Sequence, residues 1–178
     1  MAGTDATQDM PVLTPDEFEF VSGSPAQTAR IGERLGELLR PGDVVCLEGA
    51  LGSGKTCLAQ GVGRGWGASG DVTSPTYTLI HELRRLNDGP LLYHIDLYRV
   101  ESEAEAKRLG LSDLFDSRAA CMIEWPERAR GLLPDACLRV RLTSLNETRR
   151  RLTFNAEGDR HLALLAALKR VTFGVNEP

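Results

Sequence analysis

Four residues in the first third of the chain have the types and the spacing of a phosphate-binding loop. Gly49, Gly54, Lys55 and Thr56 form the pattern G-x-x-x-x-G-K-[ST]. In such a loop the glycines let the backbone curl with its N–H groups directed at phosphate oxygens, and the lysine adds a positive charge. The hydroxyl of the final threonine can bind Mg²⁺. The pattern therefore predicts binding of ATP or a similar nucleotide together with its magnesium ion.

The residues on either side of this loop support that prediction. The apolar run at 44–47 is typical of a buried strand, and segment 57–60 is compatible with a helix. A phosphate-binding loop lies between a strand and a helix, and the helix adds the positive end of its dipole to the site. The alternative is a chance glycine-rich turn, and the order of the flanking elements argues against it.

Two carboxylates each end an apolar run that is typical of a strand. Asp96 ends the run 91–96, and Glu124 follows the run 119–123. Mg²⁺ bound with a nucleotide needs one or two carboxylates, and ligands of α/β sheets gather at the carboxyl ends of strands. We therefore expect both acids in the site. The alternative for each is an acid at a strand end that faces water.

Several other residues could have either a functional or a structural role. His94 is flanked by apolar residues, and we expect a structural histidine rather than a base. The hydroxyls at 74–76 are those of a loop that responds to a γ-phosphate, or of an ordinary Ser-Pro turn. The arginines at 149–151 suggest a solvated strand end more than a phosphate-binding patch. For Trp66 we expect a place in the core or in a lid.

The remaining periodicities predict an α/β chain. Apolar alternation or continuous apolar runs predict further strands, and capping residues and apolar spacing predict helices. The helix after the phosphate-binding loop contains several glycines, which weaken a helix, so we expect its last turns to fade. We expect Asp159 to cap the last helix. The predicted strands are 18–21, 44–47, 78–83, 91–96, 119–123, 137–142 and 150–154, and the other helices begin near 24, 102, 111, 127 and 159.

These elements predict a three-layer P-loop NTPase-like fold. Its sheet is mixed and mostly parallel, with helices on both faces and with antiparallel hairpins. The 178 residues, 42% of them hydrophobic, suit one domain over 15–178 after a disordered tail at 1–14.

Composition excludes several classes of protein. The net charge of −4 gives no support to a protein that coats DNA or an anionic membrane. No apolar run approaches the roughly 20 residues of a spanning helix, and the N-terminus does not have the pattern of a signal peptide. The spacing of the four cysteines matches no zinc framework. We therefore expect a reduced, cytoplasmic protein.

Several of these motifs together resemble the TsaE (YjeE) family of small bacterial ATPases. The motifs S-P-T-Y-T, H-x-D-x-Y-R and E-W-P accompany the phosphate-binding loop in family order. With the flanking elements, the resemblance covers roughly 24–142. The stretches that carry it are 47–56, 73–79, 94–99, 109–111 and 123–126.

The resemblance implies a function and roles for particular residues. It implies an ATPase that binds the TsaB–TsaD complex and supports formation of N6-threonylcarbamoyladenosine at position 37 of tRNAs reading ANN codons, which is an indirect link to tRNA. It implies Mg²⁺ ligation by Thr56 and Glu124, and a Walker-B-like role for Asp96. It also implies that Thr76 lies in a switch-like loop and Trp125 near the nucleotide. The phosphate-holding residues implied are Gly52, Ser53, Gly54, Lys55 and Thr56.

Two other functions remain possible for a P-loop of this kind. A small-molecule kinase would need an acceptor pocket and commonly an arginine-rich lid, and the sequence shows no such insertion between strands. A nucleotide-gated binding module would bind ATP without hydrolysing it. An ATPase assay with and without TsaB–TsaD, together with a search for phosphorylated small molecules, separates the three functions.

Overall fold

The structure is a computed structural model that describes residues 14–70, 79–85, 89–115 and 118–174. Most of the predicted N-terminal tail lies outside these ranges. The hydroxyl-rich segment that contains Thr76 also lies outside them, so the predictions for that segment remain predictions.

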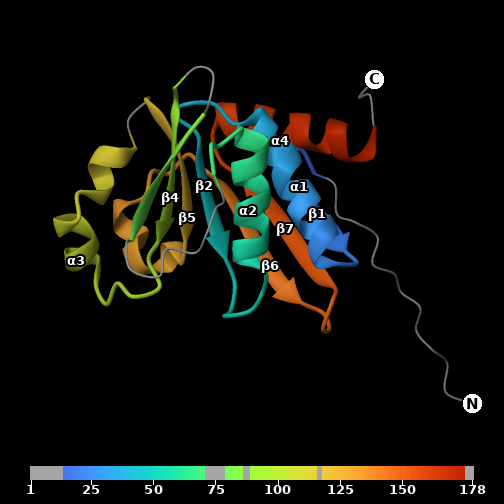
Figure 1. The fold of residues 1–178 in the computed structure, drawn as a ribbon, viewed down its shortest axis with the longest axis horizontal. Coiled ribbons are helices and arrows are strands. Elements are labelled where there is room, and N and C mark those ends of the chain that lie inside the picture. Colours follow the sequence, from blue (N-terminus) through green and yellow to red (C-terminus); the bar gives the residue numbers. More distant parts are fainter. Residues whose placement is uncertain (1–13, 71–78, 86–88, 116–117, 175–178) are drawn as a thin grey trace, which may run out of the picture.

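Within the described residues, seven strands form one mixed sheet in the order β1-β7-β6-β2-β5-β4-β3 (Figure 1). The four central strands β6, β2, β5 and β4 are parallel, and the outer pairings are antiparallel. This confirms the predicted mixed sheet with a parallel centre and antiparallel hairpins. The strands are β1 (Glu17–Ser22), β2 (Val44–Glu48), β3 (Ile80–Arg84), β4 (Leu91–Asp96), β5 (Ala119–Glu124), β6 (Leu138–Ser144) and β7 (Arg150–Ala156).

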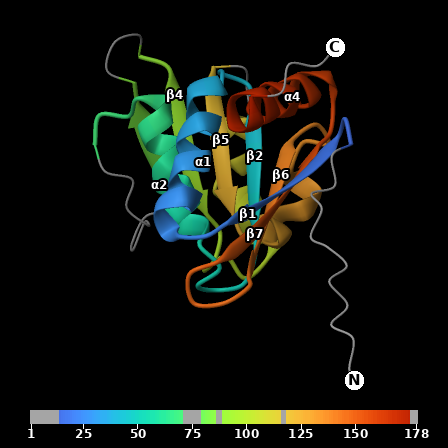
Figure 2. The same ribbon diagram turned by 90° about the vertical axis from the view of Figure 1, so that its right-hand side faces the viewer.

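Helices cover both faces of the sheet, as predicted (Figures 1 and 2). One layer contains α1 (Pro25–Leu38), α2 (Lys55–Trp66) and α4 (Asp159–Phe173). The other contains α3 (Glu103–Arg108) and the 3-10 helices η1 (Leu111–Leu114) and η2 (Pro126–Leu132). None of the helices in the described part of the chain is long and apolar enough to cross a membrane.

The central strand β2 shows why its sequence is continuously apolar. Val45 and Leu47 belong to the core under α1, α2 and α4, whereas Val44 and Cys46 belong to the core on the opposite face. Successive side chains of a strand point to opposite faces, so a strand covered on both sides needs apolar residues at every position. The same burial extends over the whole of β5. These two strands hold the elements of the site in place.

The glycines of α2 are required by its contact with α1, and the prediction of a fading helix was wrong. Helix α2 continues to Trp66, which is buried in the core. A Cβ atom on Gly61 would lie 2.0 Å from the carbonyl oxygen of Ala29, and one on Gly65 would lie 1.9 Å from that of Glu33. The two backbones pack too closely for any side chain at these positions. Tertiary packing therefore outweighs the low helix propensity of glycine.

The first helix, α1, is capped by the residue that the sequence predicts, whereas the last helix, α4, is not. Ser24 caps α1, and its side chain accepts a hydrogen bond from the backbone N–H of Gln27 at 3.2 Å. The expected cap at Asp159 was wrong: the residue before α4 is Gly158, and Asp159 lies in the first turn. A carboxylate there still favours the positive end of the helix dipole.

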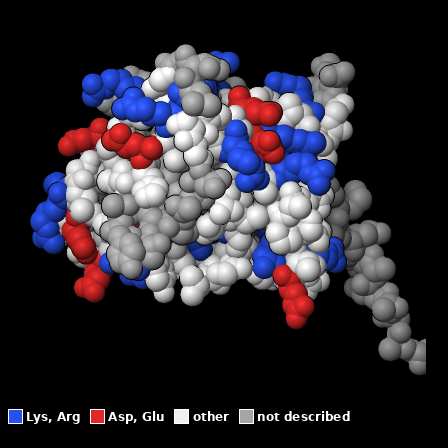
Figure 3. Space-filling view, viewed as in Figure 1, with Lys and Arg blue, Asp and Glu red and all other residues white. Residues whose placement is uncertain are grey.

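Acidic and basic side chains are interspersed on the described part of the face seen in Figure 3. A protein that coats nucleic acid concentrates basic residues on one face. The mixture on this face is consistent with the small net charge of −4.

Candidate nucleotide-binding site

The sheet brings the predicted residues to one edge. Strands β2, β5 and β4 are parallel neighbours, so their carboxyl ends meet, and the glycine-rich loop follows β2 directly. In the register of these strands Asp96 is opposite Glu124, and Glu124 is opposite Leu47. The two acids and the loop, which are far apart in the sequence, therefore lie side by side. This is the edge where ligands bind in open α/β sheets.

Three glycines of the loop have backbone angles that favour glycine. The φ angles of Gly49, Gly52 and Gly54 are 145°, 76° and 104°. Non-glycine residues adopt such angles only at a cost, because their Cβ atom collides with the backbone. Gly49 has a second constraint, since a Cβ there would lie 2.5 Å from the carbonyl oxygen of Leu142. Gly54 is the N-cap residue of α2, so the N-terminus of the helix lies at the loop.

Lys55 is held inside the loop rather than in solvent. The residue is 5% exposed, and its Nζ donates hydrogen bonds to the carbonyl oxygens of Gly49 at 2.6 Å and Ala50 at 3.0 Å. Nζ also lies 3.9 Å from the centre of the Trp125 ring. Burial lowers the pKa of Lys55, and the nearby carboxylate of Glu124 partly opposes that effect. These contacts hold the ammonium group in position for anionic oxygens at the loop.

Trp125 has the only positive φ angle among the non-glycine residues in the described ranges, with φ 60° and ψ 48°. This conformation turns the chain sharply between β5 and η2. The ring lies over Lys55 and packs against Tyr98, with ring centres 5.0 Å apart and an interplanar angle of 47°. Strained backbone in a tight turn is common at ligand sites, and here it directs an aromatic ring at the lysine.

The two acids have different surroundings. Glu124 is 2% exposed, and its Oε1 lies 2.9 Å from Nε2 of His94, which is fully buried. Asp96 is half-buried and accepts a hydrogen bond from the backbone N–H of Tyr98 at 3.0 Å. Burial raises the pKa of Asp96, with a smaller contribution from the charge of Glu124. Two neighbouring carboxylates in a partly buried place are suited to a divalent cation.

A cleft of about 340 Å³ lies between these residues. Most of the predicted site residues line it, and its other lining residues include Leu51, Cys57 and Tyr98. The predicted residues found there are Gly52, Gly54, Lys55, Thr56, Asp96, Glu124 and Trp125.

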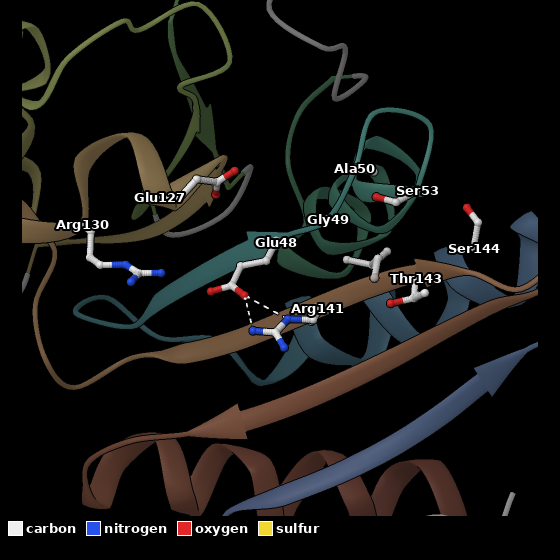
Figure 4. Close-up of a pocket in the computed structure, with 10 residues that line it drawn as sticks. Glu48, Gly49, Ala50, Ser53, Glu127, Arg130, Arg141, Thr143 and Ser144 are labelled. Atoms are coloured by element: carbon white, nitrogen blue, oxygen red, sulfur yellow. Dashed lines mark hydrogen bonds and ion pairs between the residues drawn. The ribbon is translucent and has the colours of Figure 1, made fainter.

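Gly49 and Ser53 line a second cleft, of about 500 Å³, on the other side of the loop. Figure 4 shows its wall of β2, β6 and η2, where Arg141 forms an ion pair with Glu48 at 3.0 Å and Glu127 and Arg130 lie opposite. No sequence motif indicates this cleft, because it forms between elements that meet only in the folded chain.

The residues present fit a magnesium ion bound together with a nucleotide. The described residues contain no group of three or more His, Cys, Asp or Glu side chains that could hold a metal by themselves. Mg²⁺ bound with a nucleotide takes only one or two carboxylates and fills its other positions with phosphate oxygens and water. Thr56, Asp96 and Glu124 line one cleft, and a hydroxyl and two carboxylates are groups of the kind that such an ion requires.

Arg150 belongs to the arginines at 149–151, for which the sequence favoured a solvated strand end, but it lies beside the glycine-rich loop. Its Nη2 lies 3.5 Å from the carbonyl oxygen of Gly52 in the glycine-rich loop. The neighbouring arginines behave differently: Arg149 is exposed, and Arg151 forms an ion pair with Glu19 at 3.0 Å. The interpretation of 149–151 as a solvated strand end therefore fits Arg149 alone. Nothing in the spacing of the sequence indicates a contact across 98 positions.

The mixed sheet with its parallel centre, the strand–loop–helix at β2 and the acids at the same edge define a P-loop NTPase-like protein. Comparison with known proteins narrows this class. The family model for the threonylcarbamoyl adenosine biosynthesis protein TsaE matches residues 22–152. The chain belongs to the TsaE family, as the resemblance predicted.

Proteins of known family are similar to this chain over most of its length. The tRNA threonylcarbamoyladenosine biosynthesis protein TsaE of Bacillus subtilis (strain 168) is 38% identical over 155 residues, which cover 86% of this chain and 95% of that protein. The Haemophilus influenzae protein of the same name is 36% identical, covering 76% and 82% respectively. The crystal structure of Bacillus subtilis YdiB has a TM-score of 0.72 and 31% identity, covering 93% of this chain and 99% of that one. Fold and family therefore point to the same class of protein.

Proposed function

We propose that this protein is a Mg²⁺-dependent ATPase that supports the TsaB–TsaD complex in forming N6-threonylcarbamoyladenosine at position 37 of tRNAs reading ANN codons. One observation carries the proposal: Lys55, Asp96 and Glu124 line a single cleft at the carboxyl edge of the parallel strands. Membership of the TsaE family supplies the pathway. The proposed place of action is the cytoplasm, and the four free cysteines are consistent with a reducing compartment.

The predicted site residues that line the cleft have proposed tasks. The N–H groups of the loop and Lys55 hold the phosphates, and Lys55 exchanges its hydrogen bonds to Gly49 and Ala50 for phosphate oxygens. Thr56 and Glu124 hold Mg²⁺, and Asp96 supports the metal or its water. A bound Mg²⁺ neutralises charge on the phosphates. Trp125 lies beside the nucleotide and reports on its binding.

We expect hydrolysis by the isolated chain to be slow. Fast phosphoryl transfer needs stabilisation of the charge that develops in the transition state and a positioned water molecule. Lys55 is the one cationic side chain among the described residues that line the nucleotide cleft. A partner that supplies a charge, or that acts through the segment around Thr76, would therefore accelerate the reaction.

A small-molecule kinase is the second candidate. The observation in its favour is the 500 Å³ cleft beside Gly49, which has room for an acceptor next to the glycine-rich loop. The family match favours the ATPase, because the similar proteins are named for tRNA modification.

Steady-state phosphate release with and without purified TsaB–TsaD tests the proposal. We expect slow release from the isolated chain and clear acceleration by the partner complex. Thr76→Ala should reduce the acceleration more than it reduces ATP affinity. Rapid release from the isolated chain that the partner leaves unchanged would contradict the subunit role, and phosphorylation of an added small molecule would favour the kinase.

A further inference from the structure

We propose that Arg150 is a positioning residue for the glycine-rich loop, acting from the start of β7 in the β6–β7 hairpin. The inference rests on the proposed function, since it concerns the loop that holds the nucleotide. Arg150 is the first residue of β7, and its side chain reaches from the hairpin to the loop after β2. Arg150 therefore links the β6–β7 hairpin to the glycine-rich loop, although the two are far apart in the sequence.

At one end the guanidinium is fixed to the hairpin turn. Nη1 donates to the carbonyl oxygens of Asn146 at 2.8 Å, Glu147 at 3.3 Å and Arg149 at 3.0 Å. The turn is itself held by Asn146, whose Oδ1 accepts from the backbone N–H of Arg149 at 2.8 Å and of Thr148 at 3.0 Å. One nitrogen held at three carbonyl groups leaves the guanidinium little freedom to rotate. The other nitrogens therefore have a defined direction.

At the other end the guanidinium faces the outer side of the loop. Nη2 donates to the carbonyl oxygen of Gly52 at 3.5 Å, and Nε lies 3.7 Å from the place that a Cβ on Gly54 would take. A Cβ on Gly52 would meet no atom within 4 Å, so packing does little to hold this glycine. The hydrogen bond from Arg150 therefore restrains a glycine that side-chain packing does little to hold.

The restraint matters because of what the loop must do. The N–H groups of a phosphate-binding loop need to be in place before the anion arrives, and ordering the loop at that moment would weaken binding. Gly52 and Gly54, like Gly49, have positive φ angles, and glycine loses more conformational freedom than other residues when its backbone is held in one conformation. By holding Gly52 from outside, Arg150 keeps the loop close to its binding conformation.

The charge of Arg150 contributes less to holding the loop than the geometry of its hydrogen bonds does. The side chain is partly exposed, and interactions between exposed charges are weak and are screened by salt. The geometry is specific to arginine, because its planar fork presents several donors in fixed directions. A lysine would keep the charge but could not bond the turn and Gly52 in the same way.

Three variants test the inference: Arg150→Ala, Arg150→Lys and the control Arg149→Ala, which changes an exposed arginine of the same turn. The dissociation constant for ADP is measured by calorimetry without Mg²⁺, well below the melting temperature of every variant. We expect Arg150→Ala to weaken binding about three- to tenfold, the effect of one partly exposed hydrogen bond from a charged group. Arg150→Lys should remain impaired, and Arg149→Ala should bind like the wild type.

The possible results separate this inference from the proposed function. Wild-type affinity in Arg150→Ala would overturn the positioning role, even if the variant melts at a lower temperature, because the residue would then only stabilise the hairpin. Full recovery in Arg150→Lys would also overturn it, since charge alone would then suffice. A wild-type protein that binds no ADP would overturn the proposed function itself.

Discussion

Nε2 of His94 lies 2.9 Å from Oε1 of Glu124, and both side chains are almost completely excluded from solvent. His94 is on β4 and Glu124 ends β5, so the bond joins the two parallel strands that carry the acids of the site. The other carboxylate oxygen of Glu124, Oε2, is the atom that we propose as a ligand for Mg²⁺. A histidine that holds a carboxylate in one orientation is a common support for metal ligands.

His94→Ala should therefore destabilise the protein. The substitution leaves a buried carboxylate without its donor and opens a cavity, and we expect a loss of about 1–3 kcal/mol in the free energy of unfolding. Urea unfolding measures this loss. His81→Ala, at a partly exposed position of β3, is the control and should change stability by less than about 0.5 kcal/mol. Equal small effects for both histidines would show that the bond to Glu124 contributes little.

Gly65→Ala tests the contact between α1 and α2. Alanine favours a helix by about 1 kcal/mol relative to glycine, which alone would stabilise α2. The added Cβ would lie 1.9 Å from the carbonyl oxygen of Glu33, however, and relieving that overlap must push the helices apart. We expect a net loss of about 1–3 kcal/mol in thermal or urea unfolding. Gly23→Ala, whose Cβ would be 3.4 Å from its nearest neighbour, should be close to neutral, and a stabilised Gly65→Ala would contradict the packing.

The sequence predicted much of the fold because its main signals are local. Continuous apolar runs marked β2 and β5, which are buried on both faces, and Ser24 marked the start of α1. The length of α2 could not be predicted from the same rules. Its glycines weaken an isolated helix, and only the close approach of α1, visible at Gly61 and Gly65, shows why they are there.

The site was predictable where a motif or a strand end marked it. Lys55 and the two acids were found in this way, and the sheet register brings them together. The contact between Arg150 and Gly52 was not predictable, since it depends on how the β6–β7 hairpin packs beside the loop. The bond between His94 and Glu124 was missed for the same reason: it joins adjacent strands whose register the sequence does not give.

Asp96→Asn should make the unliganded protein more stable at neutral pH. Burial, with a smaller contribution from Glu124, raises the pKa of Asp96 above its ordinary 3.8, so ionisation costs the folded state free energy. The folded protein binds more protons than the unfolded chain between 3.8 and the raised pKa, and the contribution of Asp96 to stability falls as pH rises through that window. The advantage of the asparagine variant should therefore disappear below pH 3.8. Urea unfolding across pH measures it, and a less stable variant at neutral pH would contradict the argument.

Trp125 should report on nucleotide binding. Its ring lies 3.9 Å from Nζ of Lys55 at the cleft, whereas Trp66 is buried in the core with Arg85 stacked on it. We expect a change in tryptophan fluorescence that depends on ATP and Mg²⁺ and that is lost in Trp125→Phe. The change should persist in Trp66→Phe. A signal that disappears with Trp66 instead would show that the cleft next to Trp125 is not where the nucleotide binds.

The most direct test of the account is the affinity for ATP of the wild-type protein and of Lys55→Ala, measured by calorimetry. Lys55 is held by two carbonyl groups of the loop and by Trp125, and its hydrogen bonds to phosphate would be charge-assisted. We expect the substitution to weaken binding roughly 10- to 150-fold for each hydrogen bond to phosphate that it removes. Lys107→Ala, on the exposed side of α3, should leave the affinity unchanged. ATP that binds the Lys55 variant as tightly as the wild type would contradict the assignment of this loop as the nucleotide-binding site.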